Sequence, residues 1–261
     1  MSSPDFCAAL LDQAGRFAAS ARGVDPASRV PSCPDWDVAE LVVHVGRAYR
    51  WAGDLVGRTV TDPTQMADTA AFTPPDGLDA RLDWLLEAAD QLVAAVRRVG
   101  SDTPVWNFTG RESPVAAFWP RRMTHDTVVH RVDLALAVNG SFDVDPELAA
   151  DTISEFLDLV TAPGAAAARP DLAAEMRGTG QIIHLHATDS PSLGEAGEWV
   201  ITRGPEAVTW GHGHTKGDVA ARAKVTDLMR MLFNRTNPGD PTIEVFGDAE
   251  LLGHWCRNVT F

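Results

Sequence analysis

The chain has 261 residues, of which 45% are hydrophobic and 22% charged, a balance typical of a folded globular protein. Its 36 acidic side chains outnumber the 22 basic ones, so the formal net charge is −14. This charge disfavours nucleic acid and anionic membrane as partners, because both bind to basic surfaces.

Neither the cysteines nor the apolar segments indicate export. Cys7, Cys33 and Cys256 are scattered and lack CxxC spacing, so we expect neither a disulfide framework nor a cysteine zinc site. The N-terminal residues have no basic region followed by an apolar run, and no segment reaches the ~18 apolar residues of a membrane helix. We therefore expect a protein of the reducing cytoplasm.

Two amphipathic helices are predicted at the start of the chain. Apolar residues recur with a helical period between residues 5 and 22. Asp37 and Glu40 have the spacing of a capping box, so a second helix begins there and continues to about residue 57. His44 lies on the apolar face of this helix, where an imidazole needs a hydrogen bond or a metal.

Three more helices are predicted in the following part of the chain. Residues 59–77 are rich in Thr, Pro and Asp and predict a long crossover loop. Helical patterns then cover residues 78–99, 121–137 and 146–160. Long amphipathic helices joined in this way predict an antiparallel four-helix bundle, and we place the end of that domain at residue 165.

Asp126 and His130 lie four residues apart and therefore on one face of the helix over residues 121–137. A carboxylate and an imidazole at this spacing can bind one divalent cation, but a usable site needs a third ligand. The same spacing is common in hydrogen-bonded pairs that bind no metal, so it leaves both interpretations open. In a bundle interior, His44 of the second helix is placed to be the third ligand.

Residues 166–261 predict a separate α+β domain. The Ala-rich stretch after Pro163 indicates a linker or a short helix. Strand character follows in QIIHLHATD, EWVITRG, VTW and TIEVFG, and a helix is predicted over about residues 218–234.

Histidines in this second domain form an alternative candidate metal site. His184 and His186 alternate along a strand and face one side of it, and we expect His212 and His214 to do the same. No third-ligand pattern accompanies them, and a half-exposed strand shows the same alternation without a metal.

Four groups of motifs, in order, resemble the mycothiol-dependent maleylpyruvate isomerase family. They are SCPDWDVAELVVHVGRAYRWA, FWPRRMTHDTVVHRVDLALA, IHLHATD with EWVITRG, and IEVFGDAELLGHW. The resemblance covers nearly the whole chain. It implies a DinB-like four-helix bundle over residues 1–165 and a smaller C-terminal α/β domain over residues 166–261.

The resemblance also implies a divalent metal, usually zinc, held by a histidine of the second helix and by a Glu and a His four residues apart. The matching positions are His44, Asp126 and His130. Asp126 departs from the family's usual Glu, and the lost methylene shortens the reach of the carboxylate by about 1.5 Å.

The implied activity uses mycothiol as an external thiol cosubstrate and an electrophilic small molecule as substrate. Three protein ligands leave coordination positions open, and a metal lowers the pKa of a bound thiol below its ordinary ~8.5. Addition to a double bond, rotation and elimination isomerise a cis alkene, whereas addition or displacement alone is S-transfer. The residues do not decide between these reactions.

Two further residues have alternative roles. Arg235 resembles the arginine that the family brings from its C-terminal domain to the active site, where a guanidinium suits a carboxylate substrate. It is equally placed to cap the last turn of its helix. Asp133, three residues after His130, is either a partner that orients that imidazole or a surface charge.

Two non-catalytic hypotheses also stand. The first is a small-molecule or metal-binding regulatory protein on the same fold, which the Asp at position 126 supports. The second is a structural oligomerisation module. The substrate and the oligomeric state are left open by the sequence.

Overall fold

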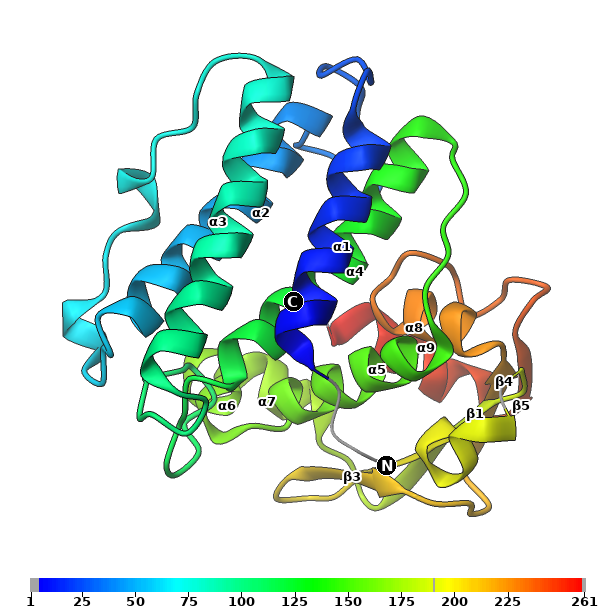
Figure 1. Ribbon diagram of the computed structural model, residues 1–261. Coiled ribbons are helices and arrows are strands. Elements are labelled where there is room, and N and C mark those ends of the chain that lie inside the picture. The colour runs from blue at the N-terminus through cyan, green and yellow to red at the C-terminus, as the bar shows by residue number, and fades with distance from the viewer. Residues whose placement is uncertain (1–4, 190, 260–261) are drawn as a thin grey trace. The chain divides into compact units, whose positions relative to one another are not determined.

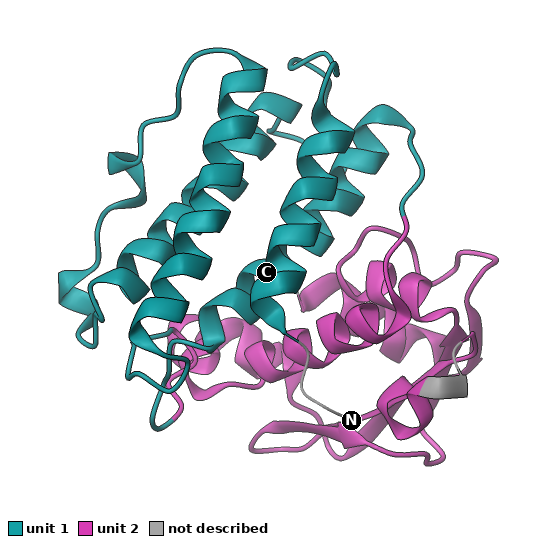
Figure 2. Ribbon diagram, viewed as in Figure 1, with its two compact units in different colours: residues 1–107, 112–142 teal, residues 108–111, 143–261 magenta. Residues whose placement is uncertain are grey.

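The computed structural model describes residues 5–189 and 191–259 (Figure 1). The chain divides into two compact units, the first of residues 1–107 and 112–142 and the second of residues 108–111 and 143–261 (Figure 2). Unit 1 is helical and unit 2 contains a five-stranded sheet. The predicted α+β class, with a helical bundle followed by a sheet-containing domain, is therefore confirmed. None of the described helices is long and apolar enough to cross a membrane.

Unit 1 is a bundle of four long helices. They are α1 (Phe6–Ala21), α2 (Val38–Gly57), α3 (Leu78–Val99) and α4 (Phe118–Val138). Asp5 caps α1, and the predicted capping box of Asp37 and Glu40 begins α2. The crossover between α2 and α3 contains two short 3-10 turns, η1 (Pro63–Gln65) and η2 (Thr69–Ala71).

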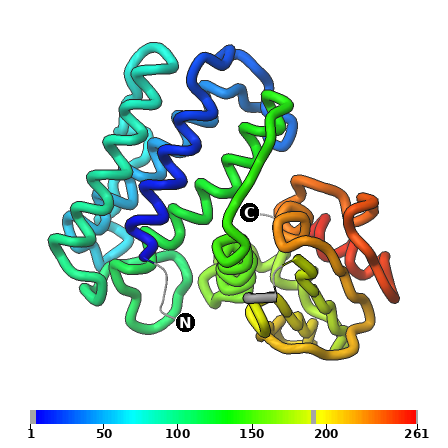
Figure 3. Tube along the Cα trace, turned by 45° about the vertical axis from the view of Figure 1, so that its right-hand side comes forward, coloured from blue at the N-terminus to red at the C-terminus, as the bar shows by residue number. Residues whose placement is uncertain are grey.

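The helix directions differ from the antiparallel arrangement that the sequence predicted. Gly46 of α2 approaches Trp84 of α3, and eleven residues later Gly57 of α2 meets Arg98 of α3, so these two helices run in the same direction. Figure 3 shows α1 (blue) and α4 (green) side by side. Thr124 of α4 bonds to Phe6 of α1, and Arg131, seven residues later, bonds to Gln13, so these two helices also run parallel. The reason is the long crossover, which returns the chain along the whole bundle before α3 begins (Figure 1).

Polar side chains of α4 are buried and find their partners on the neighbouring helices. Thr127 and Tyr49 form a hydrogen bond between α4 and α2. Arg131 donates to Gln13 of α1 at 2.6 Å. Because a buried polar group is costly without a partner, these bonds hold α4 in one rotational setting, and that setting directs Asp126 and His130 toward α2.

Unit 2 combines a mixed sheet with helices. Its elements are α5 (Pro146–Val160), α6 (Pro163–Ala168), α7 (Pro170–Met176), β1 (Gln181–Ala187), η3 (Pro191–Gly197), β2 (Glu198–Arg203), β3 (Val208–His212), β4 (Val219–Ala223), α8 (Val225–Leu232), β5 (Glu244–Gly247) and α9 (Ala249–Asn258). The strand order is β3-β2-β1-β4-β5. Strands β1 and β4 pair in parallel, and the other neighbours pair antiparallel.

Helix α5 packs within unit 2, although the sequence-based boundary at residue 165 assigned it to the bundle. Trp199 of β2 donates its indole N–H to Ser154 of α5 at 3.0 Å. The Phe156 ring of α5 lies 4.8 Å from the Phe233 ring, just after α8. The boundary between the two units therefore lies between Phe142 and Asp143.

The predicted helix over residues 218–234 is wrong in its first part, which forms strand β4. Val219, Ala221 and Ala223 alternate with more exposed residues and face the core, and β4 pairs with β1 from Val219 to Ala223. Alanine favours a helix over a strand, so the pairing with β1 overrides the local preference of this segment. Only residues 225–232 form the helix, α8.

Candidate metal centre

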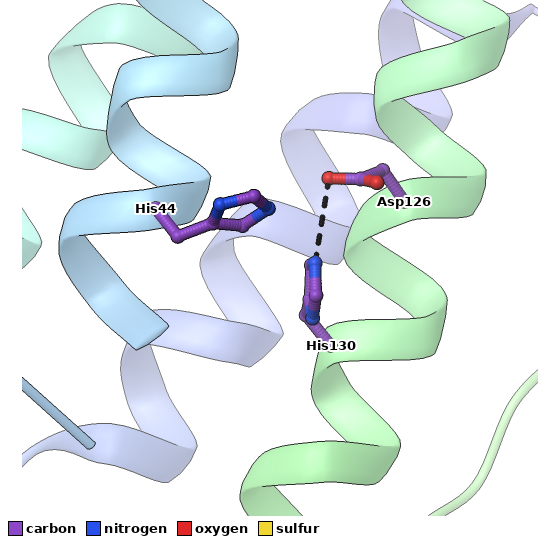
Figure 4. Close-up of side chains that lie close together, drawn as sticks. All are labelled: His44, Asp126 and His130. Atoms are coloured by element: carbon purple, nitrogen blue, oxygen red, sulfur yellow. Dashed lines mark ion pairs between the residues drawn. The ribbon is translucent and has the colours of Figure 1, made fainter. Parts of the chain in front are cut away.

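His44, Asp126 and His130 converge in the interior of the bundle. Figure 4 shows His44 pointing from α2 toward the carboxylate and the imidazole that α4 presents one turn apart. The potential ligand atoms of the three residues all lie within 4.8 Å of one another. Oδ2 of Asp126 lies 3.8 Å from Nε2 of His130. The three residues selected from the sequence are thus brought together, and metal binding by them stays a prediction.

The two carboxylate oxygens of Asp126 have different surroundings. Oδ1 accepts a hydrogen bond from Arg122 at 2.8 Å. Oδ2 is buried and has no hydrogen-bond partner among the described residues. Burial alone would raise the pKa of Asp126, but electrostatic interactions with His130, Arg122 and His44 and the hydrogen bond from Arg122 outweigh burial and hold it below its ordinary value. An ionised, buried oxygen without a donor is costly, and a cation between the two histidines would satisfy it.

Asp133 orients the imidazole of His130. Its Oδ2 lies 2.8 Å from Nδ1 of His130, and its Oδ1 accepts from the Ser32 hydroxyl at 2.5 Å. Asp133 is completely buried. The surface-charge interpretation of this residue is therefore wrong, and the predicted contact with His130 is confirmed. Engagement of Nδ1 leaves Nε2 as the atom that faces Asp126.

His44 lies between two other rings. Its ring centroid is 4.7 Å from that of Trp36 and 4.9 Å from that of His130. Burial lowers the pKa of His44, and the neighbouring His130 lowers it further. A lowered pKa favours the neutral imidazole, which is the form that binds a metal.

A pocket of about 610 Å³ opens beside His44 within unit 1. Two cations line it, Arg47 from α2 and Arg81 from α3. Each donates its Nε to a backbone carbonyl of the crossover, Arg47 to Phe72 at 3.2 Å and Arg81 to Pro75 at 3.0 Å. The aromatic side chains of Trp36 and Trp51 form part of the same wall.

The sequence reasoning missed this pair of arginines. Arg47 lies three residues after His44 and therefore on the same face of α2, a spacing that was visible in the sequence. No pattern in the sequence indicates Arg81. It lies on α3 and lines the pocket because the crossover carries the chain back along the bundle before α3 begins.

Arg235 belongs to unit 2 and follows the end of α8. Its guanidinium donates to the carbonyl oxygen of Phe233 at 2.6 Å, and its backbone N–H donates to the carbonyl of Arg230 at 2.7 Å. These bonds agree with the helix-capping interpretation. A role of Arg235 in catalysis stays a prediction.

The second domain has histidines at positions 184, 186, 212 and 214, and three of these four gather on one side of the sheet. Glu198 contacts His184, His186 and His214. His212 pairs with Trp199 in the ladder between β3 and β2, so it lies on the opposite face. The expectation that His212 and His214 face the same side is therefore wrong, and Glu198 is a carboxylate that the sequence reasoning overlooked.

A four-helix bundle with a His, Asp and His cluster between α2 and α4, followed by a mixed α/β unit, defines a two-domain α+β protein with a candidate metal centre in its helical domain. The Mycothiol maleylpyruvate isomerase N-terminal domain matches residues 7–135, and the MDMPI C-terminal domain matches residues 147–254. The chain therefore belongs to the mycothiol-dependent maleylpyruvate isomerase family, as its motifs predicted.

Solved structures agree with this fold. The crystal structure of a mycothiol-dependent maleylpyruvate isomerase has a TM-score of 0.56 at 16% identity, over 92% of this chain and 91% of that one. A histidine-to-alanine mutant of a mycothiol-dependent maleylpyruvate isomerase gives a TM-score of 0.53 at 15% identity, with the same coverage of 92% and 91%. At these low sequence identities, the similarity to the solved structures supports a shared fold alone.

Two uncharacterized proteins of Mycobacterium tuberculosis are similar in sequence. Each is 28% identical over 128 residues, which are 49% of this chain and 63% of the relative. The match thus spans less than two thirds of the length of these relatives.

Proposed function

We propose that this chain is a metal-dependent enzyme that uses mycothiol to attack an electrophilic small molecule, as a cis-trans isomerase or an S-transferase. The observation that carries the proposal is Oδ2 of Asp126, which is buried without a hydrogen-bond partner among the described residues. It faces His130 and His44 beside a pocket with two arginines. Membership of the isomerase family and the mycothiol dependence named for the solved relatives support it.

The donor set fits a divalent cation of the zinc class. Two imidazoles and one carboxylate are ligands found in catalytic zinc sites, where open positions remain for a further ligand. The cation, when bound by His44, Asp126 and His130, would supply a Lewis acid that lowers the pKa of a thiol. Asp133 holds the His130 ring in the orientation that this requires.

An external thiol is favoured because two of the three cysteines, the partly buried Cys7 and the buried Cys256, are poor nucleophiles. Burial raises the pKa of Cys7, and it raises the pKa of Cys256 to about 12. Both thiols are therefore protonated at neutral pH, and the thiolate, not the thiol, is the attacking form.

The arginines of the pocket suit a substrate that bears carboxylates. Arg47 and Arg81 use their Nε atoms to hold the crossover, and their terminal nitrogens have no hydrogen-bond partner among the described residues. Guanidinium groups in this state bind planar carboxylates by paired hydrogen bonds. We propose the same role for Arg235, as the residue that the C-terminal domain contributes.

Two outcomes follow from attack on an activated alkene. The thiolate adds to one alkene carbon, and the electron pair of the double bond moves onto the conjugated carbonyl. Rotation about the new single bond and expulsion of the thiolate then give the trans alkene without a net change of atoms. If a proton reaches the carbanion first, the product is the thioether, which is S-transfer.

The first experiment measures zinc per chain by plasma mass spectrometry in the untagged protein and in His44→Ala, Asp126→Ala and His130→Ala. We expect each variant to lose about one zinc per chain relative to the wild type. His254→Ala is the control, because His254 lies on α9 of unit 2. Isomerisation of maleylpyruvate and consumption of free thiol are then followed with and without mycothiol.

The outcomes separate the two classes of function. Loss of zinc together with loss of thiol-dependent turnover supports the enzyme. A wild type that turns over nothing, and whose zinc does not depend on these three residues, contradicts it. In that case a non-catalytic small-molecule or metal-binding protein on the same fold is the better description.

A further inference from the structure

A second convergence of metal-ligand side chains lies in unit 2, on elements other than those that carry the first. Glu198, at the start of β2, has three imidazoles around its carboxylate. His184 Nε2 lies 2.6 Å from Oε2, and Oε1 lies 2.5 Å from His186 Nδ1 and 3.2 Å from His214 Nδ1. The ligand atoms of His184, Glu198 and His214 all lie within 4.8 Å of one another.

Strand pairing brings these residues together. His186 is the direct partner of Glu198 in the antiparallel ladder of β1 and β2, and His184 lies two residues earlier on the same face. His214 arrives from the segment after β3. Gly213, with φ 148°, separates it from His212 in a conformation that favours glycine, so the two neighbouring histidines reach opposite sides of the sheet.

The charge of Glu198 is not balanced by a permanent cation. All of its ion-pair partners in the described part of the chain are histidines. A carboxylate whose side chain is only 15% exposed, and whose neighbours are imidazoles, is stabilised by a cation.

We propose that His184, Glu198 and His214 form a second divalent-cation site, which links β1, β2 and the segment after β3. Two imidazoles and a carboxylate select zinc or a neighbouring transition metal over calcium or magnesium, which prefer oxygen ligands. The site goes beyond the proposed function and does not depend on it.

The observed distances require only a small opening of the cluster. Zinc bonds of about 2.0–2.1 Å in a tetrahedron place neighbouring ligand atoms about 3.3 Å apart. The distance from Oε1 of Glu198 to Nδ1 of His214, 3.2 Å, already matches, and that from the other oxygen, Oε2, to Nε2 of His184 increases from 2.6 Å by less than an ångström. The His214 side chain is 75% exposed, so the cation enters from solvent without unfolding.

His186 acts as a positioning residue in this site. It contacts the same Oε1 of Glu198 as His214 does, but it lies outside the set whose ligand atoms are mutually close. It therefore orients the Glu198 carboxylate for the other ligands. Replacement of His186 is expected to weaken cation binding less than the loss of a ligand does.

The test uses the untagged chain of 261 residues carrying His44→Ala and His130→Ala, which removes the first site. Zinc is stripped with chelator, and the protein is titrated with Zn²⁺ against a chromophoric competitor and with Co²⁺, whose visible spectrum reports tetrahedral nitrogen and oxygen ligands. We expect about one ion per chain with both metals.

Single changes in this background then test the ligands. His214→Ala and the isosteric Glu198→Gln abolish the stoichiometric binding and the cobalt spectrum, whereas His186→Ala weakens binding about 10- to 100-fold. His212→Ala is the matched control, since it removes a histidine two residues away on the other face. Circular dichroism verifies that each variant is folded.

The proposal is overturned if the background protein binds no zinc, or if the two ligand variants bind it as the control does. Neither result bears on the first site, because that site is tested with His184, Glu198 and His214 intact. Conversely, failure of the first site leaves this titration unchanged.

Discussion

Oδ2 of Asp126 lies 3.8 Å from Nε2 of His130, and it is buried without a hydrogen-bond partner among the described residues. The other oxygen of the same carboxylate is occupied by Arg122. One oxygen is thus held by a fixed cation and the other is directed at two imidazoles. The shorter Asp side chain, which replaces the family's usual Glu, therefore still reaches the candidate metal position.

Replacement of Asp133 is expected to weaken the first metal site without removing a ligand. Asp133→Asn loses the charged acceptor at Nδ1 of His130, so zinc affinity falls about 10- to 100-fold. Competition titration with a zinc-binding dye measures the change. Ser32→Ala is the matched control, because it removes only the bond to the far oxygen of Asp133 and keeps the charge. Equal zinc affinity in Asp133→Asn and wild type would show that His130 needs no orienting partner.

Replacement of the pocket arginines is expected to affect binding of carboxylate substrates. Arg47→Gln and Arg81→Gln each lose a charge-assisted contact of about 1.5–3 kcal/mol, so KM rises about 10- to 100-fold. Steady-state kinetics with maleylpyruvate measure this effect, and zinc content should stay at the wild-type level. Arg58→Gln is the control, since Arg58 bonds to Asp54 on the exposed surface. An unchanged KM in both pocket variants would place the substrate elsewhere.

Cys256 is expected to resist alkylation in the native protein. Burial raises its pKa to about 12, so at pH 8 only about one thiol in ten thousand is ionised. Iodoacetamide labelling followed by peptide mass spectrometry should therefore be about 1000-fold slower in buffer than in urea. Rapid labelling of Cys256 in the folded chain would contradict this burial and would reopen the question of an internal thiol.

Replacement by alanine is expected to change the stability of the protein in opposite directions at two glycines of the bundle. A Cβ at Gly46 would lie 2.2 Å from the Trp84 ring, so Gly46→Ala is destabilising by about 1–3 kcal/mol. A Cβ at Gly15 of α1 meets nothing within 4 Å, so Gly15→Ala gains about 0.8–1.0 kcal/mol of helix propensity. Urea unfolding followed by tryptophan fluorescence measures both. A Gly46→Ala variant as stable as the wild type or more stable would mean that Trp84 moves aside freely.

The sequence by itself determined the helices of unit 1 and most of the first site. Helix periodicity and capping are local properties, so the segments around α1 to α4 and the Asp37–Glu40 cap were predictable. The four-residue spacing likewise placed Asp126 beside His130. His44 was selected because an imidazole in an apolar stripe needs a partner, and the family resemblance chose the same residue.

Only the tertiary structure decided the relationships that depend on long-range pairing. Arg81 reaches the pocket because the crossover makes α3 parallel to α2, and no local pattern encodes that return. The alanine-rich segment 219–223 is a strand because β1 is available to pair with it. Glu198 contacts His184 and His214, which lie 14 and 16 residues away from it in the sequence. Such contacts depend on strand register and chain reversal, which are set by packing of the whole unit rather than by neighbouring residues.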